Sequence, residues 1–328
     1  MSSKTDDFAT RVVQWQAQHG RNDLPWQNTR DPYRVWLSEI MLQQTQVATV
    51  KAYFARFLQK CPDVAALAAA SQDEVLGLWS GLGYYSRARN LHRCAQDVMR
   101  LHGGAFPTDA QTLATLPGIG PSTAAAIASL CFSERVAILD ANVKRVVTRV
   151  RGFDGDIAVA ANARALWDAA SSLLPSQKRA AQDMVRYTQG MMDLGAMVCT
   201  PKKPLCLHCP VQQDCAAFSQ GNPERYPVRS RKLKRSSQSI WLLWAQTRAG
   251  AVWLDRRPTP GVWAGLHCLP LFESEADLRD ALPEKARDAL LCEPAFTHVL
   301  THKDLHLHTC RVQLAANNRL GEGRWVPL

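Results

Sequence analysis

This chain of 328 residues lacks several features, and each absence removes a class of protein. No run approaches the ~18 uninterrupted apolar residues that a membrane-spanning helix needs. The start, MSSKTDDFAT, is polar and carries acids, unlike a secretory signal or an Arg-rich transit peptide. No solenoid repeat or low-complexity tract is present. We therefore expect a soluble, cytoplasmic, monomeric protein with no membrane partner, long enough to form two domains.

Acidic residues are fewer than basic ones, 29 against 39, which gives a net charge of +10. Residues 236–328 hold ten of each kind, so the whole excess of positive charge lies in residues 1–235. A concentrated positive charge is typical of proteins that bind a polyanion, and nucleic acid is the leading candidate. A charge that only keeps the protein in solution is the alternative.

Strand-like alternation of apolar and polar residues is missing before residue 235, where helical patterns follow one another. Asp31-Pro32 predicts the start of one long helix or of two abutting ones. After residue 235, two short apolar runs predict a β-hairpin, and one helix is expected over about 274–290. We predict a mainly α domain over 1–224, a basic linker over 225–236, and a small α+β domain over 237–328.

A framework of disulfides is not expected, because a reducing compartment keeps thiols free. Four of the ten cysteines instead lie close together, as Cys199-x6-Cys206-x2-Cys209-x5-Cys215. Four thiolates at this density predict a metal centre, and zinc is one alternative, although zinc ribbons usually carry two CxxC pairs. The spacing resembles the iron–sulfur loop of the endonuclease III superfamily of DNA glycosylases, which implies a structural [4Fe–4S] cluster.

The segment LPGIGPST, residues 116–123, joins two helical stretches. Gly118 and Gly120 permit a tight turn whose N–H groups can face a DNA phosphate at the start of the next helix, although an ordinary turn is the alternative. Asp140 follows twenty residues after Gly120, and alone it could simply cap a helix. The order of hairpin, aspartate and four-cysteine loop again resembles the endonuclease III superfamily, which implies a helix–hairpin–helix fold.

The lysine that lyases of this superfamily carry in the motif LPGxGxKTA is missing here, because Ser122 occupies its position. A hydroxyl cannot form the Schiff base with a sugar that lyase chemistry needs. The resemblance therefore implies a glycosylase without strong lyase activity. An endonuclease III-like glycosylase-lyase acting on oxidised pyrimidines is one alternative, and a catalytically idle DNA-binding or electron-transfer protein is another.

Several segments closely resemble the MutY-type adenine DNA glycosylases, and the match spans most of residues 20–225. These segments are LPW at 24–26, VWLSEIMLQQTQV at 35–47, GLGYYSRARNL at 81–91 and MDLGAM at 192–197. That family removes adenine mispaired with 8-oxoguanine. The resemblance implies that the partner is double-stranded DNA containing A:8-oxoguanine or A:G mispairs.

The resemblance also implies roles for the catalytic residues. Glu39 would be the general acid on adenine, and Asp140 would stabilise the sugar cation with help from Asn142. The apolar neighbours of Glu39 in the segment WLSEIM should desolvate its carboxyl group and raise its pKa. Two carboxyl groups on opposite sides of the bond suit the oxocarbenium-like transition state of glycosidic cleavage.

The side chains that contact DNA follow from the same family pattern. Gln44 and Tyr84 match residues that probe or wedge the helix at the lesion, although a core position is the alternative for Tyr84. Gln189 lies where the family places the amide or acid that reads the edge of adenine. Ser122 is expected to pack near the sugar, and Gly118 and Gly120 to face the phosphates.

In the last domain, GVWAG at 261–265 and the hairpin before it resemble the Nudix-like domain of the same family. The Glu-rich Nudix box that binds magnesium is missing, so no pyrophosphatase activity is expected. Phe296-Thr297-His298 stands where the family has Phe-Ser-His, a motif that recognises 8-oxoguanine. Three further histidines, His302, His306 and His308, lie near it, but no carboxylate or cysteine completes a metal site with them.

Overall fold

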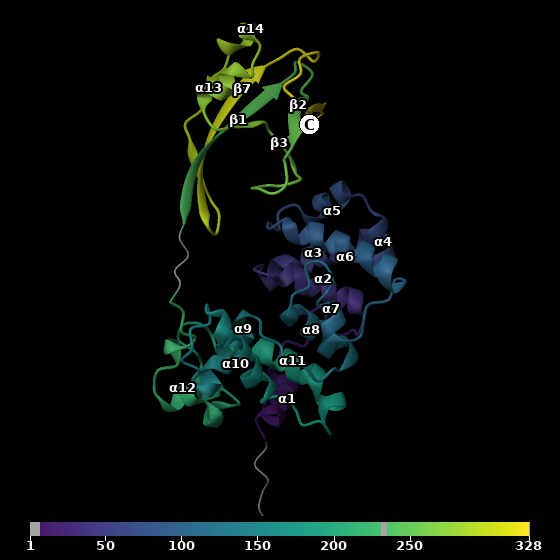
Figure 1. Cartoon of the computed structure of the whole chain (residues 1–328), viewed down its shortest axis with the longest axis vertical. Coiled ribbons are helices and arrows are strands. Elements are labelled where there is room, and N and C mark those ends of the chain that lie inside the picture. Colours follow the sequence, from purple (N-terminus) through teal and green to yellow (C-terminus); the bar gives the residue numbers. More distant parts are fainter. Residues whose placement is uncertain (1–6, 231–234, 328) are drawn as a thin grey trace, which may run out of the picture. The chain divides into compact units, whose positions relative to one another are not determined.

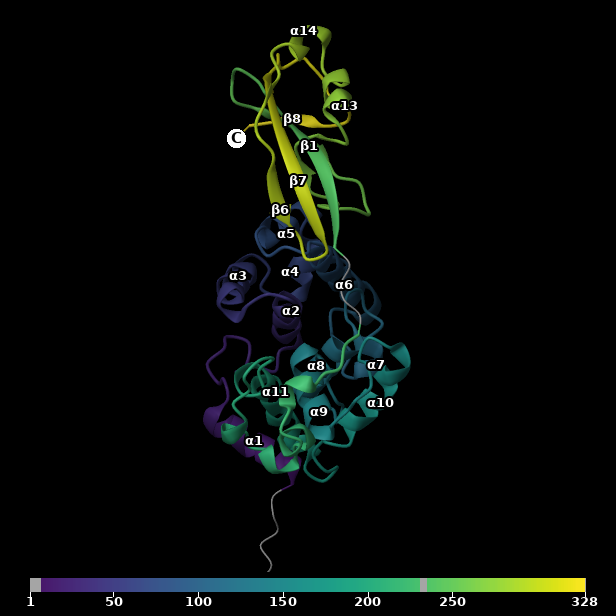
Figure 2. The same cartoon turned by 90° about the vertical axis from the view of Figure 1, so that its left-hand side faces the viewer.

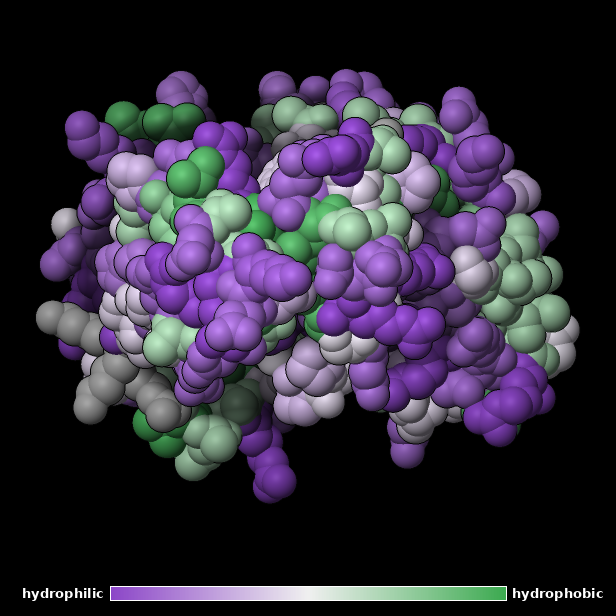
Figure 3. Space-filling view, turned by 90° about the horizontal axis from the view of Figure 1, so that it is seen from above, coloured by the Kyte–Doolittle hydropathy of each residue, from purple (hydrophilic) through white to green (hydrophobic). Residues whose placement is uncertain are grey.

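The structure, a computed structural model, describes residues 7–230 and 235–327. The chain divides into two compact units, 1–231 and 232–328. The first unit is helical and the second is built on a β-sheet, as Figure 1 shows. Within the described ranges no helix is long and apolar enough to cross a membrane. The face drawn in Figure 3 carries mostly hydrophilic residues.

The helical unit contains twelve α-helices among its described residues, from four to eighteen residues long. In chain order they are α1 (Phe8–His19), α2 (Pro32–Leu42), α3 (Val47–Lys60), α4 (Val64–Ala69), α5 (Gln72–Trp79), α6 (Ser86–His102), α7 (Ala110–Leu113), α8 (Pro121–Phe132), α9 (Ala141–Arg151), α10 (Ala160–Ser171), α11 (Ala180–Met197) and α12 (Ala216–Ser219). Short 3-10 turns cover Cys206–His208, Gln212–Asp214 and Pro223–Arg225.

These helices form two groups that share α8. One group contains α2 to α7, and the other contains α1 and α9 to α12 (Figure 1). The core of the second group is rich in aliphatic side chains, among them Val12, Val146, Val147 and Leu194, all with 1% or less of their surface exposed. Because α8 contacts both α2 and α11, it joins the two groups.

The sequence left open whether one long helix or two follow Asp31, and the structure contains two, α2 and α3. The first begins at a capped turn, where the Asp31 carboxylate accepts from the Tyr33 N–H at 2.9 Å and Pro32 takes the first helical position. It ends at Leu42, because the next residue, Gln43, has a non-helical ψ of 111° and Gln44 then adopts a left-handed backbone conformation with φ of 57°. That residue leaves the helical path and starts a turn.

The C-terminal unit is a sheet with one short helical layer. Its strands are β1 (Ser236–Gln246), β2 (Val252–Arg256), β3 (His267–Cys268), β4 (Leu271–Phe272), β5 (Leu291–Cys292), β6 (Phe296–Val299), β7 (Lys303–Gln313) and β8 (Arg324–Val326). The two long strands, β1 and β7, are parallel along their whole length, and β6 lies against β7 (Figure 2). The predicted hairpin is confirmed, since β1 pairs antiparallel with β2.

One face of this sheet packs on α13 (Glu275–Asp280), and the core there includes Leu243, Leu278 and Val312. The single helix predicted over 274–290 is wrong, because α13 ends at Asp280 and α14 (Glu284–Arg287) is separate. Pro283 explains the break: a proline cannot donate within a helix, and it disfavours helical geometry in the residue before it. The other face carries a smaller core that includes Leu305 and Leu307.

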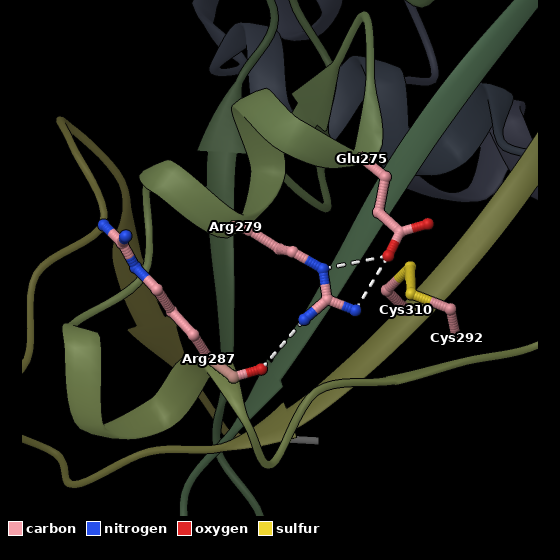
Figure 4. Close-up of a disulfide and its surroundings, with 5 residues drawn as sticks. All are labelled: Glu275, Arg279, Arg287, Cys292 and Cys310. Atoms are coloured by element: carbon pink, nitrogen blue, oxygen red, sulfur yellow. Dashed lines mark hydrogen bonds and ion pairs between the residues drawn. A yellow bond between two sulfur atoms is a disulfide. The ribbon is translucent and has the colours of Figure 1, made fainter.

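The expectation of free thiols is wrong for two cysteines. Cys292 of β5 and Cys310 of β7 form a disulfide between paired positions of the sheet (Figure 4). Beside it, the Arg279 guanidinium donates to the Glu275 carboxylate at 2.7 and 2.9 Å and to the Arg287 carbonyl at 3.0 Å. These contacts fix α13 and α14 to each other.

The basic segment predicted as a linker, 225–236, is partly packed in the structure, and residues 231–234 lie outside the described ranges. Tyr226 has 2% of its surface exposed, and its hydroxyl donates to the Gln220 side chain at 2.8 Å. The Val228 carbonyl accepts from the Ile157 N–H at 3.1 Å. The helical unit therefore extends through residue 230, because the aromatic ring of Tyr226 is buried in it.

Candidate active site

A cavity of about 290 Å³ lies between the two groups of helices. Side chains of α1, α2, α8 and α11 line it, together with the loop at residues 26–30. Glu39 and Gln189, both predicted site residues, lie in its wall. The structure therefore brings together two side chains that are 150 positions apart in the sequence.

Glu39 projects from α2 in a helix that is otherwise buried. Trp36, Leu37 and Met41 have no exposed surface and anchor the helix in the core. Burial, together with the negative charge of Asp140, raises the pKa of Glu39 to about 7, and burial is the larger of the two causes. The carboxyl group is therefore partly protonated near neutral pH, as the sequence predicted.

Asp140 is the N-cap of α9, and its carboxylate accepts from the Val143 N–H at 2.6 Å. Burial raises its pKa, although the hydrogen bonds from Val143 and Asn142 oppose that effect. Capping and a catalytic role are compatible here, because the cap fixes the position of the carboxylate. Ser122 lies nearby, where its hydroxyl accepts from the Leu139 N–H at 3.0 Å.

Asn142 is held by Arg145, a residue that no sequence pattern singled out. The Arg145 guanidinium donates to Asn142 Oδ1 at 2.9 Å, to the Cys199 carbonyl at 2.7 Å and to the Gly195 carbonyl. Gly195 permits this approach, since a Cβ there would lie 2.7 Å from the Cβ of Asn142. The MDLGAM motif thus brings α11 against the start of α9.

Gln189 is fixed by two further residues that sequence analysis missed. Its Nε2 donates to Asp193 Oδ1 at 2.9 Å, and Asp193 has no exposed surface. Arg21 donates to the same carboxylate through its Nε at 2.7 Å and its backbone N–H at 3.0 Å. Because Nε2 faces the carboxylate, the orientation of the amide is determined, and Oε1 remains free to accept. The only sequence feature that pointed to Asp193 was its place in the MDLGAM motif.

The hairpin at 116–120 turns tightly at Gly118 and leads directly into α8. Gly118 adopts a φ of 77°, and a Cβ there would lie 2.7 Å from the Cβ of Asn90. Gly120 caps α8 with ordinary backbone angles, and the space where its Cβ would lie is open. A helix N-terminus with open space in front of it can receive an anion.

Gln44 and Tyr84 both lie on exposed turns, and both have left-handed backbone angles, with φ of 57° and 49°. Non-glycine residues seldom adopt this conformation, and such residues gather at functional sites. Tyr84 has 42% of its surface exposed, so its alternative reading as a core residue is wrong.

Arg87 joins these two turns, and sequence analysis missed it. Its guanidinium donates to the carbonyls of Ile40, Met41 and Gln43 at the end of α2, and to the Thr45 hydroxyl. It also donates to the carbonyls of Leu82 and Gly83 at 3.3 and 3.2 Å. One side chain therefore holds together the turns that carry Gln44 and Tyr84.

Cys199, Cys206, Cys209 and Cys215 all line one cavity beside α9. Within residues 7–230 and 235–327, no three cysteine, histidine or acidic side chains converge closely enough to hold one metal ion. The four thiols that line this cavity are the side chains available to hold a metal centre.

Charge at this cavity also fits an anionic cluster. Arg149 is 1% exposed, and its guanidinium lies 3.3 Å from Cys199 Sγ. Burial raises the pKa of Cys209 to about 12, so four bare thiolates would not persist there without a compensating cation. A buried guanidinium beside four cysteines suits ligands that become thiolates when metal binds.

The three residues of the Phe-Thr-His motif form part of β6, and all are exposed. Thr297 pairs with His306, whereas Phe296 and His298 pair with Leu307 and Leu305. Because alternate residues of a strand point to opposite faces, Thr297 lies on one face of the sheet, and Phe296 and His298 lie on the other. The motif is therefore divided between two faces.

Two family models match the chain. Residues 37–171 match the HhH-GPD superfamily of base excision DNA repair proteins, and residues 240–328 match the NUDIX domain. An adenine DNA glycosylase of Buchnera aphidicola subsp. Acyrthosiphon pisum is 36% identical over 309 residues, which cover 94% of this chain and 87% of that one. The human adenine DNA glycosylase is 43% identical over 227 residues, which cover 66% of this chain and 40% of the human one.

Solved structures resemble the helical unit. A thermostable thymine-DNA glycosylase superposes with a TM-score of 0.57 at 30% identity, over 65% of this chain and 95% of that one. Endonuclease III in a non-covalent complex with DNA superposes with a TM-score of 0.53 over 65% of this chain and 94% of that one. At 19% identity the second likeness concerns the fold alone.

Proposed function

The chain belongs to the adenine DNA glycosylases of the HhH-GPD superfamily, and from this premise we propose which side chains break the bond and opposite which base. The enzyme is an adenine-specific DNA glycosylase with a Nudix domain, and DNA is its partner. We propose that it hydrolyses the N-glycosidic bond of adenine paired with 8-oxoguanine or guanine. The observation that carries the mechanism is the raised pKa of Glu39 in a cavity shared with Gln189.

Glu39 acts as the general acid. A carboxyl group with a pKa of about 7 is protonated often enough near neutral pH to donate to a departing base. Its proton passes to a ring nitrogen of adenine as the bond between C1′ and the base breaks, and the bonding electrons leave with the base. Water then adds to C1′, and its proton replaces the one that Glu39 gave.

Asp140 supports the positive charge that develops on the sugar. Burial raises its pKa, and the Val143 and Asn142 N–H groups oppose that effect because they stabilise its anion. An ionised Asp140 beside a protonated Glu39 gives the pair of opposite states that glycosidic cleavage uses. Asn142, held by Arg145, assists from the next turn.

Gln189 distinguishes adenine from guanine. Its Nε2 is committed to Asp193, so Oε1 is the acceptor available to the cavity. Adenine presents an exocyclic amino donor at C6, whereas guanine presents a carbonyl acceptor there. The amide thus pairs with adenine and opposes guanine.

Ser122 makes the enzyme monofunctional, since its hydroxyl can form no Schiff base. DNA contacts come from the Gly118–Gly120 turn on a phosphate and from Gln44 and Tyr84 at the gap left by the extruded adenine. Thr297 is the candidate residue for recognising the base opposite adenine. Phe296 and His298 lie on the other face of the sheet.

The four cysteines at 199, 206, 209 and 215 would hold a [4Fe–4S] cluster that ties the end of the helical unit together. Metal analysis of purified protein should find about four irons per chain. One zinc and no iron would replace this assignment with a zinc site.

The experiment that tests the proposal compares single-turnover excision on duplexes carrying A opposite 8-oxoguanine, A opposite guanine, and thymine glycol opposite A. Strand breaks should appear only with the first two and only after alkali treatment. Glu39→Gln should abolish them, whereas Asp154→Asn, the same chemical change on an exposed residue, should not. Breaks without alkali, or cleavage at thymine glycol, would instead support a glycosylase-lyase.

A further inference from the structure

Thr297, His306 and Ser237 form a continuous hydrogen-bonded row on one face of the C-terminal sheet. His306 Nδ1 lies 3.1 Å from Thr297 Oγ1, and His306 Nε2 lies 2.8 Å from Ser237 Oγ. The three residues come from the neighbouring strands β6, β7 and β1, which Figure 2 shows side by side. The imidazole ring is therefore held between two hydroxyl groups.

The strands that carry this row are braced against each other. Arg235 forms an ion pair with Asp304 and donates to the Thr301 carbonyl at 3.3 Å. Lys303 Nζ donates to Gln238 Oε1 at 2.9 Å. These contacts join the start of β1 to the β6–β7 hairpin, so Ser237 and His306 keep their separation.

A neutral imidazole offers one donor and one acceptor, so the two hydroxyl groups must play opposite roles. When Nε2 carries the hydrogen, it donates to Ser237, and Nδ1 accepts the hydrogen of Thr297. The lone pairs of Thr297 Oγ1 then remain as acceptors toward solvent. The other tautomer reverses both bonds and leaves Thr297 with a hydrogen to donate.

Whether Thr297 Oγ1 accepts or donates determines which group on the edge of a purine it can pair with. 8-Oxoguanine carries a hydrogen on N7, whereas guanine has a bare acceptor at N7. A hydroxyl fixed as an acceptor therefore pairs with 8-oxoguanine and not with guanine. We propose that His306 is a positioning residue that presents Thr297 Oγ1 as an acceptor to N7–H of 8-oxoguanine, with Ser237 receiving the Nε2 hydrogen. The inference rests on the proposed role of Thr297 in reading the base opposite adenine.

The test uses the full-length enzyme with three substitutions of His306, one control substitution of His302 and, for the reader itself, Thr297→Val. In His306→Asn the side-chain amide reaches the place of Nδ1, and in His306→Gln it reaches the place of Nε2. His306→Phe keeps a ring and removes both nitrogens. His302→Phe makes the same change on an exposed histidine of the same hairpin and serves as the matched control.

Affinity and single-turnover excision are measured with adenine opposite 8-oxoguanine, guanine or 8-bromoguanine, which has bulk at C8 but no N7 hydrogen. We expect His306→Phe and His306→Gln to lose about five- to tenfold of the preference for 8-oxoguanine over 8-bromoguanine, the size of one hydrogen bond. His306→Asn should retain the preference within about twofold, as should His302→Phe.

Two results would overturn the inference. A parental preference in His306→Phe would show that the ring does not position the reader. An equal loss on all three bases would show a general structural defect, which circular dichroism would confirm. Thr297→Val separates the inference from the proposed function. If this variant keeps the preference for 8-oxoguanine, Thr297 does not read the base, and the proposed role of Thr297 is wrong. If Thr297→Val loses the preference and His306→Phe keeps it, only the positioning role of His306 is wrong.

Discussion

Replacing Glu39 with glutamine should abolish excision and also stabilise the helical unit at alkaline pH. The pKa of Glu39 is about 7 in the folded protein, against 4.5 ordinarily. Below pH 4.5 both folded and unfolded chains are protonated, and the residue contributes nothing to pH dependence. Between these values the folded chain keeps a proton that the unfolded chain loses, so stability falls as pH rises, and the loss is complete above about 7.

The size of the effect follows from the pKa difference of about 2.5. At 1.36 kcal/mol for each pKa unit, ionised Glu39 costs the folded state about 3 kcal/mol above neutral pH. Glutamine has a similar shape and no charge, so Glu39→Gln should recover this energy at about pH 8.5 and gain almost nothing at about pH 4.5. The buried carboxyl group that catalysis requires therefore lowers the stability of the folded protein above neutral pH.

The assay is urea unfolding of the full chain at both pH values, followed by far-UV circular dichroism, which reports mainly on the helical unit. Asp154→Asn is the control, because it makes the same chemical change at the surface. If Glu39→Gln and the parent unfold with the same free energy at about pH 8.5, Glu39 is not desolvated and the assigned acid is wrong.

Three other outcomes are expected. Arg87→Met should lower the free energy of unfolding by at least ~3 kcal/mol in urea titrations, because several buried carbonyls lose their donor. Asp193→Ala should slow adenine excision at least about tenfold while duplex binding in a gel-shift assay changes little, because the Gln189 amide loses its fixed orientation. Reduction of Cys292–Cys310, 18 positions apart, should destabilise the C-terminal unit by about 3 kcal/mol in calorimetry, and Cys292→Ser should not respond to the reductant.

Local patterns sufficed to predict much of this molecule. Asp31-Pro32 correctly indicated a capped helix start, because capping depends on residues within one turn. The position of Glu39 among apolar neighbours correctly predicted a raised pKa. The break at Pro283 was also visible in the sequence, since an interior proline ends a helix, yet the helical pattern around it was given more weight.

Contacts between distant segments were beyond such reasoning. Arg21 and Asp193 are 172 positions apart, and the local sequence around neither residue predicts their ion pair. The disulfide needs the register of β5 against β7, which no composition rule supplies. The division of the Phe-Thr-His motif between two faces required knowing that residues 296–299 form a strand.

The six acceptors gathered around Arg87 have an evolutionary consequence. A lysine at this position would offer three donors on one nitrogen and could not span both turns. Insertions or deletions in either turn would move acceptors that the other turn also depends on. A change of length in the segment at 40–45 should therefore be accompanied by a change of length in the segment at 82–84 among descendants of this chain.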